Sequence, residues 1–214
     1  MRDDTLTPEL VLQAYRAGVF PMSETRDSEE IFWVDPLQRG ILPLDGFHMS
    51  RSLRRRLRRE DYQITFDTCF EKVVQGCADR DETWINDTIF DLYTVLHRRG
   101  DAHSCEVWQE ETLVGGVYGV AIAGAFFGES MFSTATDASK VGLAYLTDRL
   151  VACGYVLFDT QFITDHLTTL GAIEIDRRDY HAMLREALDV TAQFNASLPL
   201  PRPQDLIQRN TQTS

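Results

Sequence analysis

Two acidic residues stand inside otherwise apolar stretches of the sequence. Glu129 belongs to the string FFGESMFS at Phe126–Ser133, and Asp159 belongs to FDTQ at Phe158–Gln161. A lone carboxylate in such a strand-like run is costly to bury unless a cation or a hydrogen-bond donor meets it. Packing alone rarely places acids there, so the two residues predict a functional site.

Asp159 and Gln161 are two positions apart on an expected strand. Their side chains should therefore emerge on the same face of a sheet. A carboxylate beside a carboxamide can orient and polarise an incoming amine, which must be unprotonated when it attacks a carbonyl carbon. The alternative is an Asp/Gln pair at a strand end that caps the turn into the next helix.

Arginine is concentrated in one short segment. The chain of 214 residues has a formal net charge of −12, yet six arginines lie within Arg51–Arg59. Ser50 predicts a helix cap here, and Leu53 and Leu57 predict its apolar face. A basic strip on an acidic chain indicates local phosphate contact, the alternative being a solvated face or one paired with the acidic body. The arginines expected to bind RNA phosphates are Arg51, Arg54, Arg55, Arg58 and Arg59.

The N-terminal half is predicted to be mainly helical. Thr7-Pro8 is typical of a helix start, and Gly18 ends that helix. Another helix is expected from about Asp87 to Arg99, before a glycine. A strand at Tyr62–Phe66 and a helix capped by Asp67 lie between them.

The pattern of the C-terminal half predicts an α+β fold. Three alternating stretches joined by short turns predict an antiparallel meander. A helix from about Asp137 to Cys153, a strand at Tyr155–Asp159, a strand near Ile173–Ile175 and a helix from about Arg177 to Leu188 follow. This is the order of N-acetyltransferase-like (GNAT-like) domains, in which helices flank a mainly antiparallel sheet. The three strands of the meander are His103–Gln109, Thr112–Ile122 and Ala125–Ser133.

The expected division is a small N-terminal subdomain (1–37), a GNAT-like catalytic domain (38–195) and a flexible C-terminal tail (196–214) that contains three prolines. The acidic N-terminus lacks the apolar core of a signal peptide, and the uncharged run Gly115–Gly128 is too short and glycine-rich to span a membrane. A cytoplasmic location without membrane contact is therefore expected. The four cysteines show no metal-binding or disulfide spacing, so no metal is expected. No cofactor is implied either.

Several separated strings resemble the leucyl/phenylalanyl-tRNA–protein transferase family. They are the two strings that carry the acids, AYRAGVFP at Ala14–Pro21, TWI at Thr83–Ile85, DASK at Asp137–Lys140 and LGAIEIDRRDY at Leu170–Tyr180. The resemblance runs in register from about Leu10 to Leu188. It implies a GNAT-like fold and the transfer of Leu or Phe, with Met as a further candidate, from aminoacyl-tRNA to the N-terminal Arg or Lys of an acceptor protein. The new N-terminus would be a degradation signal.

The resemblance also implies roles for the polar residues. Gln161 would hold the α-amine of the acceptor, and Asp159 would polarise that amine. Glu129 would bind the cationic side chain of the acceptor's first residue. The alternative for Glu129 is an internal ion pair, for example with Lys140.

Aromatic and apolar residues match the donor site of the family. Phe126 and Met131 correspond to the pocket for the donor's Leu or Phe side chain, with plain core packing as the alternative for Phe126. In an unbroken strand Phe126 and Glu129 would face opposite sides, so a shared site requires a bulge, expected at Gly128. The residues that correspond to the lining of the terminal adenosine site are Tyr15, Trp84 and Tyr93, each equally compatible with the core.

Two features depart from the family pattern. Many members have Trp after GxFP, whereas this chain has Met22, for which Trp33 is the candidate substitute, and a longer N-terminal extension is missing. Two other functions stay open. An acyl-CoA-dependent N-acyltransferase would need a pyrophosphate loop, but no glycine has Arg or Gln three positions before it, and Asp137 would repel the phosphates. A non-catalytic RNA-binding module is the second alternative.

Overall fold

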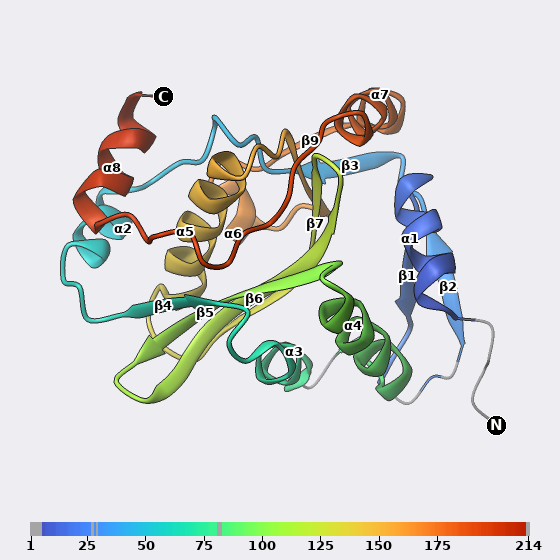
Figure 1. Cartoon of the computed structure of the whole chain (residues 1–214), viewed down its shortest axis with the longest axis horizontal. Coiled ribbons are helices and arrows are strands. Elements are labelled where there is room, and N and C mark those ends of the chain that lie inside the picture. The colour runs from blue at the N-terminus through green and yellow to red at the C-terminus, as the bar shows by residue number, and fades with distance from the viewer. Residues whose placement is uncertain (1–5, 27, 29, 81–82, 213–214) are drawn as a thin grey trace.

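Figure 1 shows the computed structural model of the chain, which describes residues 6–26, 28, 30–80 and 83–212. Within these residues, seven strands form a central sheet in the order β4-β5-β6-β7-β8-β3-β9. Neighbouring strands are antiparallel except β7 and β8, which are parallel. The strands are β3 (Gln38–Ile41), β4 (Gln63–Phe66), β5 (Ala102–Gln109), β6 (Thr112–Ile122), β7 (Ala125–Ser133), β8 (Leu157–Gln161) and β9 (Ile173–Asp176).

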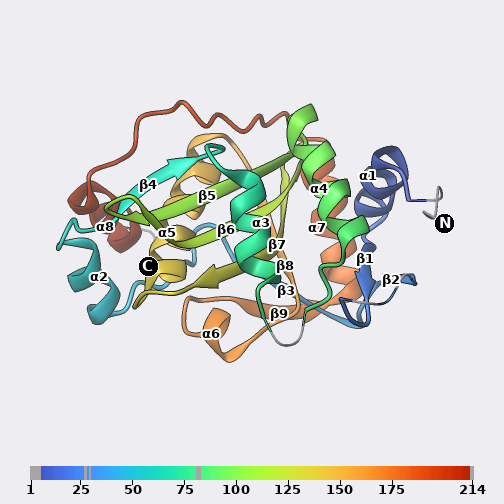
Figure 2. The same ribbon diagram turned by 90° about the horizontal axis from the view of Figure 1, so that it is seen from below.

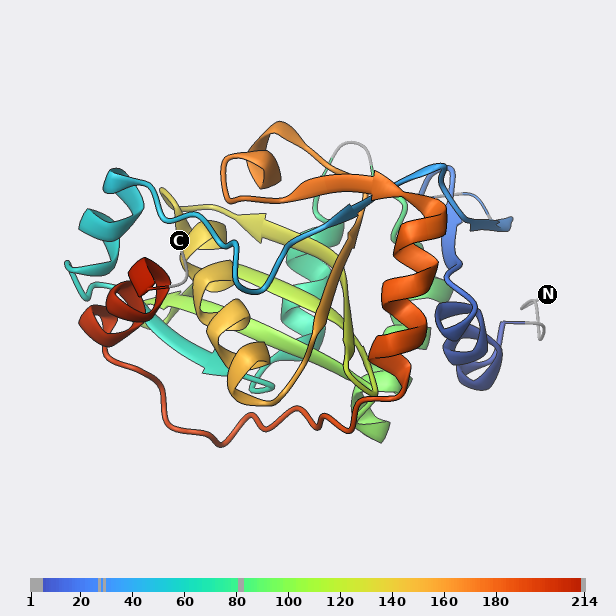
Figure 3. The same ribbon diagram turned by 90° about the horizontal axis from the view of Figure 1, so that it is seen from above.

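Helices cover both faces of this sheet. The first core, which contains Phe126 and Phe158, lies under α2, α5, α6 and α8, with α5 in front of the sheet in Figure 3. The second core, which contains Phe127 and Leu157, lies under α1, α3, α4 and α7, and Figure 2 shows α3 and α4 on this side. Consecutive strand residues enter different cores, as the pleat of a strand requires. The helices are α1 (Pro8–Arg16), α2 (Arg51–Leu57), α3 (Phe70–Ala78), α4 (Asp87–Arg99), α5 (Ala138–Ala152), α6 (Asp165–Thr168), α7 (Arg177–Leu188) and α8 (Pro203–Gln212).

The local signals that predicted helix ends are confirmed at several positions. Thr7 caps α1 by accepting a hydrogen bond from the Leu10 amide, and Ser50 caps α2 in the same way. Gly100 ends α4 in the left-handed conformation, with φ +82°. The predicted meander is formed by β5, β6 and β7. The segment before β3 also contains a two-stranded ribbon of β1 (Phe20–Ser23) and β2 (Ile31–Val34).

The prediction that Asp67 caps a helix is wrong. α3 begins at Phe70, and its N-cap residue makes no side-chain hydrogen bond. Asp67 has φ +58°, and its carboxylate instead accepts hydrogen bonds from the Ser104 amide and contacts Nδ1 of His103 at 2.8 Å. The left-handed backbone therefore directs this side chain across to β5 rather than onto the next helix.

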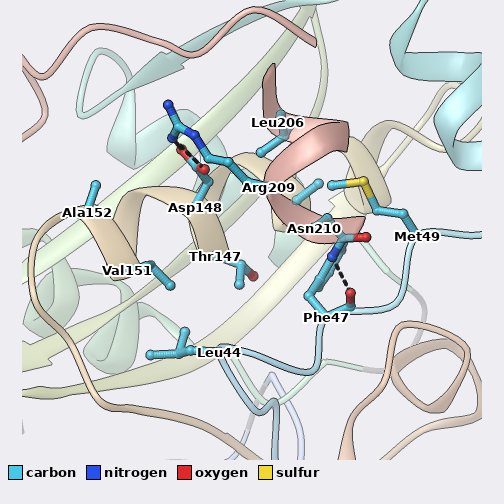
Figure 4. Close-up of a pocket in the computed structure, with 11 residues that line it drawn as sticks. Leu44, Phe47, Met49, Thr147, Asp148, Val151, Ala152, Leu206, Arg209 and Asn210 are labelled. Atoms are coloured by element: carbon cyan, nitrogen blue, oxygen red, sulfur yellow. Dashed lines mark hydrogen bonds and ion pairs between the residues drawn. The ribbon is translucent and has the colours of Figure 1, made fainter. Parts of the chain in front are cut away.

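Part of the predicted tail is the helix α8. α8 packs against α5 with Leu206 and Ile207 buried. A cavity of about 160 Å³ lies beside the two helices. Figure 4 shows the residues that line it, among them Arg209, which pairs with Asp148. Proline suits the first turn of a helix, and Pro203 begins α8. The division of the chain at residue 37 stays a prediction.

Candidate active site

The candidate site forms where β7 and β8 separate. The two strands are paired only from Ala125 and Leu157 to Phe127 and Asp159. On its other side, β7 changes register with β6, because Tyr118 lies opposite Ser130 whereas Gly119 lies opposite Gly128. Glu129 is the extra residue, so the predicted bulge is present directly after Gly128. The bulge turns Glu129 toward the gap between the strands.

A cavity of about 230 Å³ fills this gap. Glu129 and Gln161 contribute carboxylate and carboxamide groups to its wall, and Arg80 lies at its edge. Most of the remaining wall is apolar. It includes Val117, Met131, Leu143, Phe158 and Leu167. The cavity thus joins an apolar pocket to two polar side chains, which is the usual composition of a small-molecule site.

Glu129 is buried, and both of its carboxylate oxygens accept hydrogen bonds. Its Oε1 accepts hydrogen bonds from the Tyr15 hydroxyl at 2.7 Å and from Nε2 of Gln161 at 2.9 Å. Its Oε2 accepts a hydrogen bond from the Tyr93 hydroxyl at 2.7 Å. The side chain stays about 9% exposed, toward the cavity.

Glu129 has no counter-ion in the described part of the chain. No lysine, arginine or histidine there forms an ion pair with it, and Lys140, the alternative partner, pairs with Asp137 at 3.1 Å. Burial raises the pKa of Glu129 to about 7, although its three hydrogen bonds oppose the shift; the nearby charge of Asp159 adds to it. The predicted alternative of an ion pair with Lys140 is therefore wrong.

The contacts between Glu129, Tyr15 and Tyr93 require one proton more than the two phenols supply. The Tyr15 and Tyr93 hydroxyl oxygens lie 2.7 Å apart, so Tyr15, Tyr93 and the carboxyl form a closed ring of three short contacts. Burial first, and Glu129 second, raise the pKa of both phenols well above the ordinary value, so each keeps one proton. Two phenolic protons cannot serve three contacts, whereas a protonated Glu129 would complete the ring. The geometry and the raised pKa therefore agree that a proton is retained near neutral pH.

Asp159 is buried and fully neutralised. Arg39 donates to it from Nε at 3.0 Å and from Nη2 at 2.7 Å, and Tyr180 donates its hydroxyl at 2.6 Å. Burial disfavours the charge on Arg39, but Asp159 outweighs burial and raises the pKa of this guanidinium. The Arg39 guanidinium also lies over the rings of Phe20 and Tyr180, at 4.5 and 4.4 Å. Asp159 does not line the cavity, so it acts on the site through its neighbours.

Gln161 connects the two acids. Its backbone amide donates to Oδ1 of Asp159 at 2.7 Å, and its side chain donates to Glu129. With φ +64°, it is the central residue of a three-residue γ-turn closed by a hydrogen bond from the Phe162 amide to the Thr160 carbonyl at 2.7 Å. Such a backbone costs on the order of 1–3 kcal/mol and needs support from its surroundings. The Asp159 carboxylate caps this turn, as the alternative from the sequence expected for an Asp/Gln pair at a strand end. The same Gln161 also binds Glu129.

The structure places the two expected pocket residues differently. Met131 lines the cavity, but Phe126 has no exposed surface and does not. Phe126 packs against Phe158 with the ring centroids 5.5 Å apart, and Phe158 forms the cavity wall. The direct pocket role of Phe126 is therefore not supported, because the bulge turns Glu129 toward the cavity while Phe126 stays in the core.

The expected adenosine residues divide in a similar way. Trp84 lines the cavity and lies edge-on to Tyr93. Tyr15 and Tyr93 have no exposed surface, so neither can stack on a base; their hydroxyls hold Glu129 instead. Met22 lines the cavity, whereas Trp33 lies opposite Pro21 and so faces away from Met22. The proposed substitution by Trp33 is wrong for this reason.

The arginine helix α2 presents most of its charge to solvent. Arg54 is half-buried and donates to the Met49 carbonyl. Arg56 pairs with Asp61 and lies over the ring of Tyr62, at 3.9 Å from its centroid. The other four arginines are exposed and make no ion pair with any residue that the structure describes. These four are Arg51, Arg55, Arg58 and Arg59.

Two side chains at the centre of the site were missed from the sequence. Arg39 is the largest fully buried side chain, and Tyr180 was matched only as the last residue of a motif without a role. A signal for Arg39 existed, since a buried Asp159 requires a cation and Arg39 adjoins the apolar run Gly40–Leu42. Nothing in the spacing connected the two, because they are 120 residues apart.

Comparison with known proteins decides the family. Residues 41–185 match the family described as leucyl/phenylalanyl-tRNA protein transferase, and residues 4–37 match its N-terminal domain. The chain belongs to this family. It is 63% identical to the leucyl/phenylalanyl-tRNA–protein transferase of Ruegeria sp. (strain TM1040) over 98% of this chain and all of that protein. It is 60% identical to the transferase of the same name from Cereibacter sphaeroides, over the full length of both.

The fold is the predicted GNAT-like one. The structure resembles FemX with a TM-score of 0.51 and 11% sequence identity, over 78% of this chain and 66% of FemX. At this identity the likeness concerns the fold alone. Family membership does not favour an acyl-CoA-dependent acyltransferase, and Asp137 at the start of α5 is bound to Lys140.

Neither a metal site nor a membrane helix is found in the described ranges. No group of three His, Cys, Asp or Glu side chains there could hold a metal ion. None of the described helices is long and apolar enough to cross a bilayer.

Proposed function

We propose that this protein transfers Leu or Phe, with Met as a further donor, from aminoacyl-tRNA to the N-terminal Arg or Lys of acceptor proteins. The elongated N-terminus would serve as a degradation signal, and the reaction would take place in the cytoplasm. Membership of the leucyl/phenylalanyl-tRNA–protein transferase family supports the reaction type. The residue roles below are supported by the geometry of the cavity.

The observation that carries the acceptor role is the missing counter-ion of Glu129. Asp159 has a guanidinium bound to it, whereas Glu129 is also buried and receives hydrogen bonds from neutral donors of the described residues. A buried carboxylate without a cation is unfavourable, and an acceptor that begins with Arg or Lys would supply that cation. We therefore assign recognition of the acceptor's first side chain to Glu129.

The apolar wall of the cavity suits the donor's side chain. Met131, Leu143, Phe158 and Leu167 surround a space next to Glu129 and Gln161. Burial of a Leu or Phe side chain contributes about 1.5–3 kcal/mol, and a flexible Met lets one pocket fit both shapes. Phe126 contributes indirectly by packing behind this wall. Trp84 and Met22, on the same cavity, are the candidate contacts of the terminal adenosine.

Gln161 is oriented to receive an amine. Because Nε2 donates to Glu129, Oε1 of the same carboxamide is the group left to accept a hydrogen bond. An acceptor α-amine can donate to this oxygen while its lone pair points at the donor's ester carbon. Asp159 fixes the turn that carries Gln161, so we assign it a positioning role through the backbone rather than direct contact with the amine.

The reaction moves one proton from the attacking amine to the leaving ribose oxygen. The amine nitrogen forms a bond to the carbonyl carbon, the bond from that carbon to the ribose oxygen breaks, and this oxygen takes up a proton. An α-ammonium group has a pKa of about 7.7–8, so it must lose a proton before it attacks. Positioning of the two substrates supplies most of the remaining rate.

The exposed arginines of α2 are the proposed contacts of the tRNA phosphates. α2 packs on α5, and Leu143 of α5 lines the cavity. A tRNA held on α2 would therefore lie on the helix that borders the donor pocket. Four exposed guanidinium groups without partners in the described structure favour this role over a face paired with the acidic body.

A reporter peptide tests the function directly. A peptide that begins with Arg is incubated with leucyl-tRNA or with isoleucyl-tRNA, and its mass is measured. We expect a gain of one residue with leucyl-tRNA only, because the β-branched Ile side chain differs in shape from Leu and Phe. Elongation supported by acetyl-CoA, or tRNA binding without any product, would overturn the proposal.

A further inference from the structure

One edge of β7 is left open beyond the bulge. β8 pairs with β7 only as far as Phe127, so within the described residues the strand continues to Ser133 with a neighbour on one side. Antiparallel partners alternate between residues bonded to each other and residues whose main-chain groups point away. The Thr134 amide donates to the Val114 carbonyl, so Thr134 is one of the residues whose main chain is bonded toward β6. By this alternation, the main-chain groups of Met131 and Ser133 face away from β6.

A groove runs along this edge. Its lining includes Met131, Phe132 and Ser133 of β7, Thr164 and His166 at the start of α6, and Gln75 of α3. Its volume is about 910 Å³, and it shares Met131, Thr164 and Arg80 with the cavity that contains Glu129. The cavity therefore opens directly into a groove whose wall carries unpaired main-chain groups. Such an edge is a template for another extended chain.

We propose that the acceptor polypeptide binds this edge as an additional strand, parallel to β7. The proposal rests on the proposed function, because it takes the acceptor's amine to lie at Gln161. β8 ends at the γ-turn on Gln161. A chain that starts at this turn and runs toward Ser133 would lie beside β7 in the position that β8 occupies before the turn. β8 is parallel to β7, so the acceptor is parallel too. Recognition beyond the first residue is then made by the main chain and is insensitive to sequence.

Arg80 occupies part of this edge. Its guanidinium donates a hydrogen bond to the Met131 carbonyl. This carbonyl is one of the outward-facing groups identified by the alternation, so the contact confirms that the edge can receive a donor. An amide N–H of the bound acceptor would replace the guanidinium there. Arg80 itself is exposed and follows α3, which leaves it room to move aside.

A proline substitution tests the edge from the side of the enzyme. Ser133→Pro removes an outward-facing N–H that takes no part in the ladder with β6, and Ser133→Ala is the matched control, because the hydroxyl also binds the Ser139 amide. We expect the KM for an Arg-starting peptide to rise about three- to tenfold in Ser133→Pro relative to Ser133→Ala, the effect of one hydrogen bond. The KM for leucyl-tRNA should not change. Equal peptide KM values in two folded variants would overturn the proposal.

A second measurement uses the unchanged enzyme and keeps the proposal testable if Ser133→Pro unfolds. Acceptor peptides are methylated at single backbone nitrogens after the first residue. A bound strand predicts that KM rises about three- to tenfold at one of two successive positions and stays unchanged at the other. Equal tolerance at both positions would overturn the proposal. If the unmethylated peptide is not elongated at all, the proposed function fails instead.

Discussion

At the scale of single residues, the contrast between the two buried acids explains their different roles. Asp159 is neutralised by Arg39 and Tyr180 and cannot exchange partners without a large cost. Glu129 is held by two phenols and a carboxamide, all neutral, and it borders a cavity. A cation from outside can therefore lower the energy of Glu129 but not that of Asp159. The proposed selectivity of the site for basic N-termini rests on this difference.

The substitution Glu129→Gln tests this selectivity. Hydrogen bonds to charged groups contribute about 1.5–3 kcal/mol, so kcat/KM for an Arg-starting peptide should fall about ten- to a hundredfold. In the wild type, Glu129 is ionised only above its pKa of about 7, so kcat/KM should rise as the pH increases through about 7. The variant should lose this ionisation and retain only that of the peptide's amine. A pH profile unchanged by the substitution would contradict the assignment.

Stability provides the control for that variant. The pKa of Glu129 is raised in the folded state, so the stability that its proton contributes is present at low pH and is lost as the pH rises through about 7. A neutral Gln avoids the buried charge. Glu129→Gln should therefore unfold at a higher denaturant concentration than the wild type at pH 8, which would exclude misfolding as the cause of lost activity.

At the scale of elements, the packing of the short helix α2 determines which of the neighbouring arginines are exposed. Leu53 and Leu57 bury one side of the helix, and Arg56 is turned back onto Asp61 and Tyr62. The arginines that remain exposed are those that the apolar anchors leave on the outer surface. α2 therefore offers two kinds of arginine for a matched comparison.

Neutralisation of these two kinds should affect tRNA binding differently. Arg58→Gln removes an exposed charge, and Arg56→Gln removes one that is already paired. The dependence of log affinity for leucyl-tRNA on log salt should weaken by roughly 0.7–0.9 in Arg58→Gln if one phosphate contact is lost. It should stay unchanged in Arg56→Gln. Equal slopes in both variants and the wild type would remove Arg58 from the tRNA contacts.

At the scale of the whole molecule, Arg39 joins parts of the chain that are far apart in sequence. It lies on β3 and binds Asp159 of β8, Tyr180 of α7 and the carbonyl of Gly18 beyond α1. The N-terminal segment is therefore tied to the sheet that carries the site. α1 also supplies Tyr15, which passes through the second core to reach Glu129.

Removal of Arg39 should destabilise the whole protein. Arg39→Leu leaves the Asp159 charge buried without a cation, which typically costs about 3–5 kcal/mol of unfolding free energy. The double variant Arg39→Leu/Asp159→Leu should recover much of this loss but not the activity, because the turn at Gln161 loses its cap. Denaturant unfolding and the peptide assay measure the two effects. A double variant with normal activity would show that the cap is dispensable.

Much of the fold was accessible from the sequence because its signals are local. Thr7, Ser50 and Gly100 act within one turn of their helices, and the alternation of the meander depends on neighbouring residues only. The bulge was also predicted, from a site shared by Phe126 and Glu129, although only Glu129 lines the cavity. α8 was missed because its apolar residues are few and are stabilised by α5 rather than by their own helix.

The sequence by itself determined most of the secondary structure, the family and the two acids of the site, because each depends on residue type and short spacing. Only the tertiary structure decided which acid is neutralised and which is available. The sheet order places β3 beside β8, so Arg39 meets Asp159, and α1 and α4 bring Tyr15 and Tyr93 to Glu129. Such contacts between distant segments depend on how the elements pack, and no local pattern records them.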